Sequence, residues 1–147
     1  MTLFVVFLFL AIYNAGCMTA LQLQNYGIYP AVGREGFAEY MRANARAAVL
    51  PTILPGMLLQ FTSIALVIFR PWFVGRDEAW FALVLNLATL FSTIRWQRRL
   101  QGQMAATGYD ETKVRLLIRT NWIRTISYLM LAVLCLAILL RVLEGAG

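Results

Sequence analysis

The sequence predicts an all-α fold, an integral membrane up-down four-helix bundle. Of the 147 residues, 61% are hydrophobic and only 14% are charged, whereas about a quarter of the residues in a soluble domain are charged. The chain also divides into four long apolar stretches, and a membrane crossing needs about 20 such residues. Four crossings use nearly the whole chain, so we predict a single four-span transmembrane domain over residues 1–147.

The first span is expected at about residues 3–23. No charged residue precedes Arg34, so nothing interrupts an apolar helix in this part of the chain. The segment Ala15-Gly16-Cys17 weakly resembles a lipoprotein cleavage site. However, no Lys or Arg precedes the apolar stretch, and apolar residues continue beyond the cysteine. We therefore interpret the segment as a membrane span and not as a secretion signal.

The second span is expected at about residues 47–69, between the charged residues Arg46 and Arg70. Two prolines, Pro51 and Pro55, lie near its start. A proline inside a helix lacks the N–H that would bond to the preceding turn. The sequence therefore predicts a kink at the beginning of this span.

The third and fourth spans are expected at about residues 79–96 and 119–141. Their uncharged cores are slightly shorter than a full crossing, so we expect the arginines at their ends to reach the headgroups or to form ion pairs. Asp110 or Thr112 can cap a helix that begins before the fourth span. That helix should therefore project beyond the membrane.

The basic residues predict the orientation of the chain. Ten of the thirteen lie on the side of the loops that join spans one to two and three to four, and the opposite side has Arg70, Arg76 and Arg141. The ten are Arg34, Arg42, Arg46, Arg95, Arg98, Arg99, Lys113, Arg115, Arg119 and Arg124. Because Lys and Arg accumulate in cytoplasmic loops, we expect a multi-pass protein of the cell (inner) membrane with both termini periplasmic or extracellular.

The same composition argues against several classes of function. The basic residues lie at the ends of apolar runs and not along one soluble face, so nucleic acid is not an expected partner. There is no histidine, and Cys17 and Cys135 lie in apolar runs at different depths, so we expect no disulfide, no metal site and no cofactor. The expected partners are membrane lipids, together with a larger membrane protein complex or further copies of the chain.

Four polar side chains are expected near the middle of the membrane, one in each span. They are Asn14, Gln60, Asn86 and Tyr128. A polar group costs free energy in hydrocarbon unless it is bonded, so these side chains should face the interior. Spans three and four also repeat small and polar residues at helical spacing: Asn86, Thr89, Thr93 and Gln97, then Asn121, Thr125, Tyr128, Ala132 and Cys135. We favour interhelical hydrogen bonding over a ligand cavity as the explanation.

A second group lies at the predicted cytoplasmic mouth, where Arg95 ends span three and Arg124 begins span four. Two guanidinium groups at one depth repel each other unless an anion lies between them. Asn121 is three residues from Arg124 and can hold its guanidinium, and Trp122 offers an aromatic face. We take Asn121, Arg124, Arg95 and Trp122 as candidate ligand-binding residues. The alternative is that the arginines simply reach lipid headgroups.

The segment from Gly36 to Arg46 is predicted to form an amphipathic helix before span two. Its charged face includes Glu35, Glu39 and Arg42. We expect the apolar face to lie on the membrane surface and the charged face to be solvated. A catalytic role for Glu35 or Glu39 is the less favoured interpretation.

Several stretches of the chain resemble a family of small bacterial four-span membrane proteins related to the anthrone oxygenases. They are Tyr29-Pro30, Phe37-Ala38-Glu39-Tyr40, the Pro51 to Pro55 region, Arg98-Arg99-Leu100 and Leu116 to Thr125 (LLIRTNWIRT). The resemblance implies a hydrophobic aromatic substrate and no metal or organic cofactor, with Asn121 and Arg124 as the positions carried over. Relatives often have histidine near the positions that correspond to Met41, Asn44 and Gln97, and this chain has none. Proton transfer by histidine near neutral pH is therefore not available to it.

Three classes of function follow from these observations. We first expect a structural or accessory component of a membrane assembly, without a catalytic centre. The alternative is a cofactor-independent, oxygenase-like enzyme that acts on a lipophilic aromatic substrate in a cavity between the spans. A proton-coupled exporter ranks last, because it would ordinarily use a carboxylate inside the membrane and no predicted span contains one. A closed bundle would favour the first class, and a large pocket open to lipid would favour the second.

Overall fold

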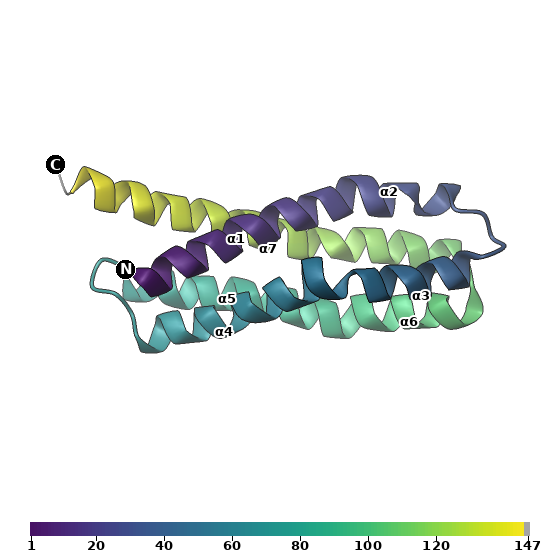
Figure 1. The fold of residues 1–147 in the computed structure, drawn as a ribbon, viewed down its shortest axis with the longest axis horizontal. Helices are drawn as coiled ribbons and strands as arrows, with labels where there is room; N and C mark the ends of the chain where they lie inside the picture. Colours follow the sequence, from purple (N-terminus) through teal and green to yellow (C-terminus); the bar gives the residue numbers. More distant parts are fainter. Residues whose placement is uncertain (146–147) are drawn as a thin grey trace.

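The structure, a computed structural model, describes residues 1–145 and is an all-α bundle, as the sequence predicts (Figure 1). Within these residues, four helical stretches are long and apolar enough to cross a membrane. They are Thr2–Ala31, Val49–Ile68, Arg76–Thr107 and Glu111–Glu144. The expected spans at 3–23, 47–69, 79–96 and 119–141 fall almost wholly within them. Three of the stretches have 30 to 34 residues and are roughly 45 to 50 Å long, which exceeds the apolar thickness of a bilayer.

The long stretches are built from shorter elements that follow one another with little interruption. The α-helices are α1 (Thr2–Ala20), α2 (Tyr26–Ile28), α3 (Phe37–Ala47), α4 (Leu54–Ile68), α5 (Arg76–Ser92), α6 (Arg98–Thr107) and α7 (Glu111–Glu144). A 3₁₀ turn, Tyr29–Ala31, ends the first stretch. Helix α1 packs against α4 and α7, and α5 packs against the same two helices. Both termini lie at one end of the molecule (Figure 1).

Two hydrophobic cores follow one another along the bundle. The first lies in the half that holds the termini, and it is formed by α1, α4, α5 and α7. The second lies in the other half, where α3 packs against α6. Phe37, Met41, Leu100 and Met104 are buried there. The predicted amphipathic segment is thus a helix, but its apolar face is covered by α6 and does not lie on a membrane surface. The apolar faces of α3 and α6 bury each other, so the bundle continues beyond the apolar belt, the part of the molecule formed by the four apolar spans.

Three π-helical turns interrupt the long helices, at Leu21–Asn25, Val49–Ile53 and Thr93–Gln97. The turn at Val49–Ile53 contains Pro51 and lies where the prolines predict a kink. Pro55 has no N–H to donate to the carbonyl of Pro51 four residues earlier. That carbonyl instead accepts a hydrogen bond from the hydroxyl of Tyr13 on α1, at 3.0 Å. The irregular turn is therefore stabilised by a neighbouring helix, as backbone groups within a membrane require.

Turns at the end opposite the termini use glycine at two positions. Gly36 precedes α3 with φ +81°, and Gly108 follows α6 with φ +85°; such left-handed conformations favour glycine. Asp110 then caps α7 by accepting a hydrogen bond from the backbone N–H of Lys113 at 3.1 Å. The predicted cap is thus confirmed at Asp110, and α7 is one continuous helix from Glu111 to Glu144.

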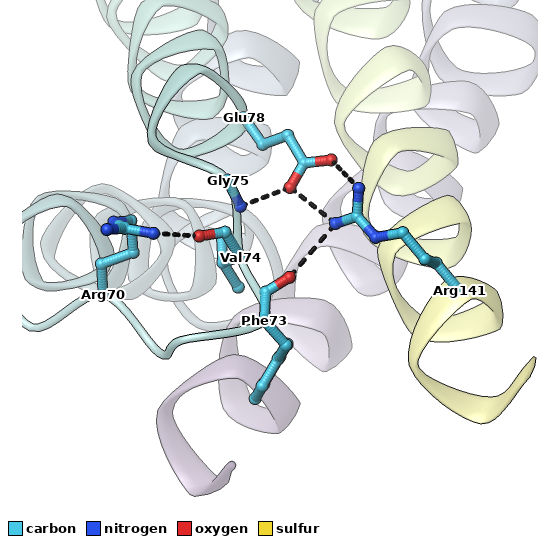
Figure 2. Close-up of polar contacts among 6 residues, drawn as sticks. All are labelled: Arg70, Phe73, Val74, Gly75, Glu78 and Arg141. Atoms are coloured by element: carbon cyan, nitrogen blue, oxygen red, sulfur yellow. Dashed lines mark hydrogen bonds and ion pairs between the residues drawn. The ribbon is translucent and has the colours of Figure 1, made fainter. Parts of the chain in front are cut away.

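At the end that holds the termini, Arg141 of α7 clamps the loop between α4 and α5 (Figure 2). Its guanidinium donates to both carboxylate oxygens of Glu78, each at 2.9 Å, and to the carbonyl of Phe73 at 3.2 Å. Glu78 also accepts from the backbone N–H of Gly75 at 2.7 Å, which caps α5. Arg70 donates to the carbonyl of Val74. The expectation that boundary arginines form ion pairs is confirmed for Arg141.

Candidate functional site: a buried arginine beside a lateral cavity

The four polar side chains expected at mid-membrane lie inside the bundle. Asn14, Asn86 and Tyr128 are buried and Gln60 is half-buried. The Gln60 amide donates to the carbonyl of Asn86 at 2.8 Å, and this bond joins α4 to α5. The hydroxyls of Thr89 and Tyr128 lie 3.3 Å apart in a hydrogen bond that joins α5 to α7. The interhelical bonding favoured from the sequence is therefore present.

Nearer the α3–α6 half, a chain of hydrogen bonds joins three buried polar side chains. The Asn121 amide donates to the side-chain oxygen of Gln22 at 2.7 Å, and Arg124 donates to the side-chain oxygen of Asn121 at 3.2 Å. Gln22 also donates to the carbonyl of Ile118 at 3.3 Å. Asn121 is fully buried and Gln22 nearly so. The predicted contact between the Asn121 amide and the Arg124 guanidinium is thus present, and Gln22 completes it from the first helical stretch.

Arg124 differs from the other two residues of this hydrogen-bond series because it is charged and, in the part of the chain that the structure describes, has no acidic side chain paired with it. Arg124 is only 9% exposed, and its Nε has no hydrogen-bond partner among the described residues. The ion pairs found within residues 1–145 join other residues: Asp110 with Lys113, Glu111 with Arg115, and Glu78 with Arg141. A buried charge without a counter-charge is costly, and it is uncommon within a membrane span unless it has a function.

Arg124 lines a cavity of about 120 Å³ between α4, α5 and α7. The polar residues of its wall are Thr52, Gln60, Thr89, Thr93 and Tyr128, and the remaining wall residues are Ile53, Gly56, Met57 and Leu90. Arg124 and Tyr128, on α7, are buried, whereas Ile53, Met57 and Leu90 are 40–51% exposed. The cavity therefore has a polar floor on α7 and an apolar rim that opens between α4 and α5 on the lipid-facing side of the bundle.

All three π-helical turns contribute to this region. Leu21–Asn25 contains Gln22, Val49–Ile53 contains Thr52, and Thr93–Gln97 contains Thr93 at the cavity wall. A π-turn inserts one residue into a helix and re-aims the side chains that follow, and such turns are frequent at functional sites. Their convergence distinguishes this region from the rest of the bundle.

The structure does not bring the other two candidate residues to the cavity. Arg95 is exposed and lies against the ring of Trp96, with 6.0 Å between the guanidinium carbon and the ring centroid. Trp122 is 43% exposed on the outer face of α7. The side chain of Gln97, two residues after Arg95, bonds to the Leu117 carbonyl and the Thr120 hydroxyl. Gln97 thus faces α7 from inside the bundle, whereas Arg95 faces outward and does not line the cavity that Arg124 lines.

Gln22, Thr52 and Thr93 were not predicted as site residues from the sequence. Gln22 is one of two glutamines that follow the apolar run of α1, and its burial at 5% exposure distinguishes it from the exposed Gln24. Nothing in the sequence separates these two residues, because the π-turn decides which of them faces α7. Thr93 was seen only as part of the polar stripe on span three. Its neighbours on that stripe, Thr89 and Gln97, are indeed buried.

Met41, Asn44 and Gln97 lie in or against the second core, around Tyr26 and Tyr29. Met41 is buried in that core. Asn44 donates to the Tyr29 hydroxyl at 3.1 Å, and the Tyr26 hydroxyl donates to the side-chain oxygen of Gln97 at 3.4 Å. In this chain the region is a hydrogen-bonded core.

Within the described residues, no group of three metal-ligating side chains could hold a metal ion, and Cys17 and Cys135 are free thiols. The chain matches no protein-family model, no curated protein and no solved structure. The interpretation of its function therefore rests on the geometry of the buried arginine and the cavity.

Proposed function

We propose that the chain is a non-catalytic membrane protein that binds the polar end of one lipophilic molecule in the lateral cavity. The observation that carries the proposal is the combination of a polar floor, which includes Arg124, with an apolar rim open between α4 and α5. A molecule with one polar end and an apolar body matches that arrangement, because its body can stay among lipid tails while its polar end leaves them. Ligand sites generally combine apolar walls with a few placed polar groups.

An accessory role in a membrane assembly is compatible with such a site, and a bound lipid can also stabilise the contact with a larger subunit or a second copy. We further propose that both termini lie on the periplasmic or extracellular side of the inner membrane, since ten of the thirteen basic residues lie toward the opposite side. The cavity is nearer the α3–α6 half, so it would accept ligands from the cytoplasmic leaflet.

An oxygenase-like enzyme is the second candidate, because Asn121 and Arg124, the positions carried over by resemblance, lie at or beside the cavity. The size of the cavity argues against it. About 120 Å³ is well below the roughly 300–1,000 Å³ of pockets that enclose whole organic ligands. A substrate with several fused rings could not be enclosed without a rearrangement of α4 or α5.

Filling the cavity tests the proposal. Thr93→Phe would add a ring at the cavity wall, whereas Val84→Phe would add the same kind of ring on the exposed face of α5. We expect the natural protein and Val84→Phe, purified in mild detergent, to retain a lipophilic molecule in a molar amount close to that of the protein. Thr93→Phe should have lost this molecule. Mass spectrometry of organic extracts measures this. Equal retention by all three proteins would exclude the cavity as the binding site.

A further inference from the structure

The charge of Arg124 indicates which polar end the cavity accepts. We propose that the ligand is a single-chain amphiphile with a carboxylate, such as a fatty acid, and that its carboxylate is the counter-ion of Arg124. This inference rests on the proposed function, since it names the ligand class of the same cavity. An uncharged polar end would leave the guanidinium unpaired, whereas a carboxylate would neutralise it in a region where unpaired charge is most costly.

The chain itself does not supply this counter-ion. Its seven acidic residues are Glu35, Glu39, Asp77, Glu78, Asp110, Glu111 and Glu144, and none of them lines the cavity. The groups that face Arg124 from the packed helices are uncharged: the Tyr26 hydroxyl, amides, other hydroxyls and apolar side chains. Asn121 accepts one of its hydrogen bonds and leaves the positive charge in place.

The depth of Arg124 distinguishes it from an arginine that reaches headgroups. Arg119, five residues earlier on α7, is exposed and marks the edge of the apolar belt. At 1.5 Å per residue, Arg124 lies roughly 7 to 8 Å farther toward the middle of the membrane. An arginine on the lipid-facing surface could extend back to the edge, but the guanidinium of Arg124 is held inside the bundle by Asn121 at 3.2 Å.

The volume and the rim favour a carboxylate on one chain over a phospholipid headgroup. A cavity of about 120 Å³ admits a small terminal group and the first part of a chain. Ile53, Met57 and Leu90 form an exposed apolar rim, against which the rest of the chain can lie. A phosphate diester with its glycerol backbone and second chain would have to leave most of its polar surface on this apolar rim.

The test compares three ligands that share one chain: lauric acid, lauryl alcohol and lauryl phosphate. Each is titrated at neutral pH into the detergent-purified protein, and binding is read from native mass spectra and from the thermal unfolding midpoint. We expect laurate to bind best and the alcohol to bind about tenfold to a hundredfold more weakly, which is the difference expected from a charged hydrogen bond. Arg124→Gln should abolish the preference for the acid over the alcohol. Val84→Phe, on the lipid face, should keep it.

Arg124→Lys is the control for misfolding of Arg124→Gln. It keeps the positive charge, so it should retain a weaker preference for laurate over the alcohol. Equal binding of acid and alcohol would overturn the carboxylate assignment but leave the proposed function standing. Stronger binding of lauryl phosphate would also overturn it and assign the site to a phosphate. If none of the three bound, and Thr93→Phe behaved as the natural protein, the proposed function and this inference would both fail.

Discussion

The contact between Gln22 and Asn121 should couple the first and last helical stretches energetically. Asn121→Ala removes the amide that donates to Gln22 at 2.7 Å and accepts from Arg124 at 3.2 Å. A buried polar group that loses its partner costs about 1–3 kcal/mol, whereas interhelical bonds in membranes contribute about 0.6–2 kcal/mol each. With two partners affected, we expect Asn121→Ala to lower the free energy of unfolding by about 2–4 kcal/mol.

Gln22→Ala should lower the free energy of unfolding by less, about 1–3 kcal/mol, because Arg124 stays bonded to Asn121. This variant does also lose the 3.3 Å bond from Gln22 to the Ile118 carbonyl. The double variant should be less destabilised than the sum of the two, by about 1 kcal/mol, since the shared bond can be lost only once. Reversible unfolding in mixed detergent micelles, followed by circular dichroism, measures all four proteins. Additivity within about 0.3 kcal/mol would refute the coupling and with it the polar chain at the site.

Three further predictions concern other parts of the molecule. Tyr13→Phe should lower the free energy of unfolding by up to about 1 kcal/mol, because the Pro51 carbonyl loses its hydroxyl donor and keeps only the Cys17 thiol at 3.6 Å. An unchanged unfolding midpoint in detergent would contradict this. Lys113 holds the pKa of Asp110 below its ordinary value of 3.8, so the ionised cap stabilises α7 above that pH and the effect is lost as the pH falls through the lowered pKa. Asp110→Asn should therefore be less stable than the natural protein at neutral pH and converge with it in acid, and a constant difference across the pH range would exclude this. A reporter enzyme fused after Gly147 should be active only outside the cytoplasm, and cytoplasmic activity would reverse the proposed orientation.

The spans and their interior faces could be predicted because they depend on local patterns. Charged residues bound the apolar runs, and the repeat from Asn121 to Cys135 at offsets of three and four identifies the face of α7 that is buried. The irregular turn around Pro51 and the cap at Asp110 follow from the chemistry of single residues. None of these features needs knowledge of a neighbouring helix.

The roles of Arg95 and Arg124 could not be separated in this way. Both lie at the inner end of a span, and counting residues from the outer flank gives them one depth. In the structure, a π-turn at Thr93–Gln97 changes which side chains of this stretch face inward. The result is an exposed Arg95 and a buried Arg124. The turn forms in the packed bundle, so its effect on the two arginines appears only when the helices are placed together.

The second core was missed for a related reason. The segment from Phe37 to Ala47 is amphipathic, and an amphipathic helix beside a membrane span can lie on the bilayer or against another helix. The apolar positions Leu100 and Met104 on α6 complete the pair. They follow a run of basic residues that looks like the end of a span, so the sequence gives little indication that this helix continues.

Photochemical labelling tests the central claim, the lateral cavity beside Arg124, most directly. The protein in lipid nanodiscs is exposed to a fatty acid with a photoactivatable group in its chain, and the labelled residues are mapped by peptide mass spectrometry. We expect the labelling to be concentrated on the rim, at Ile53, Met57 and Leu90, and to be lost in Thr93→Phe. Labelling spread evenly over lipid-facing residues elsewhere, such as Phe9 on α1 and Val133 on α7, and unchanged in that variant, would contradict it.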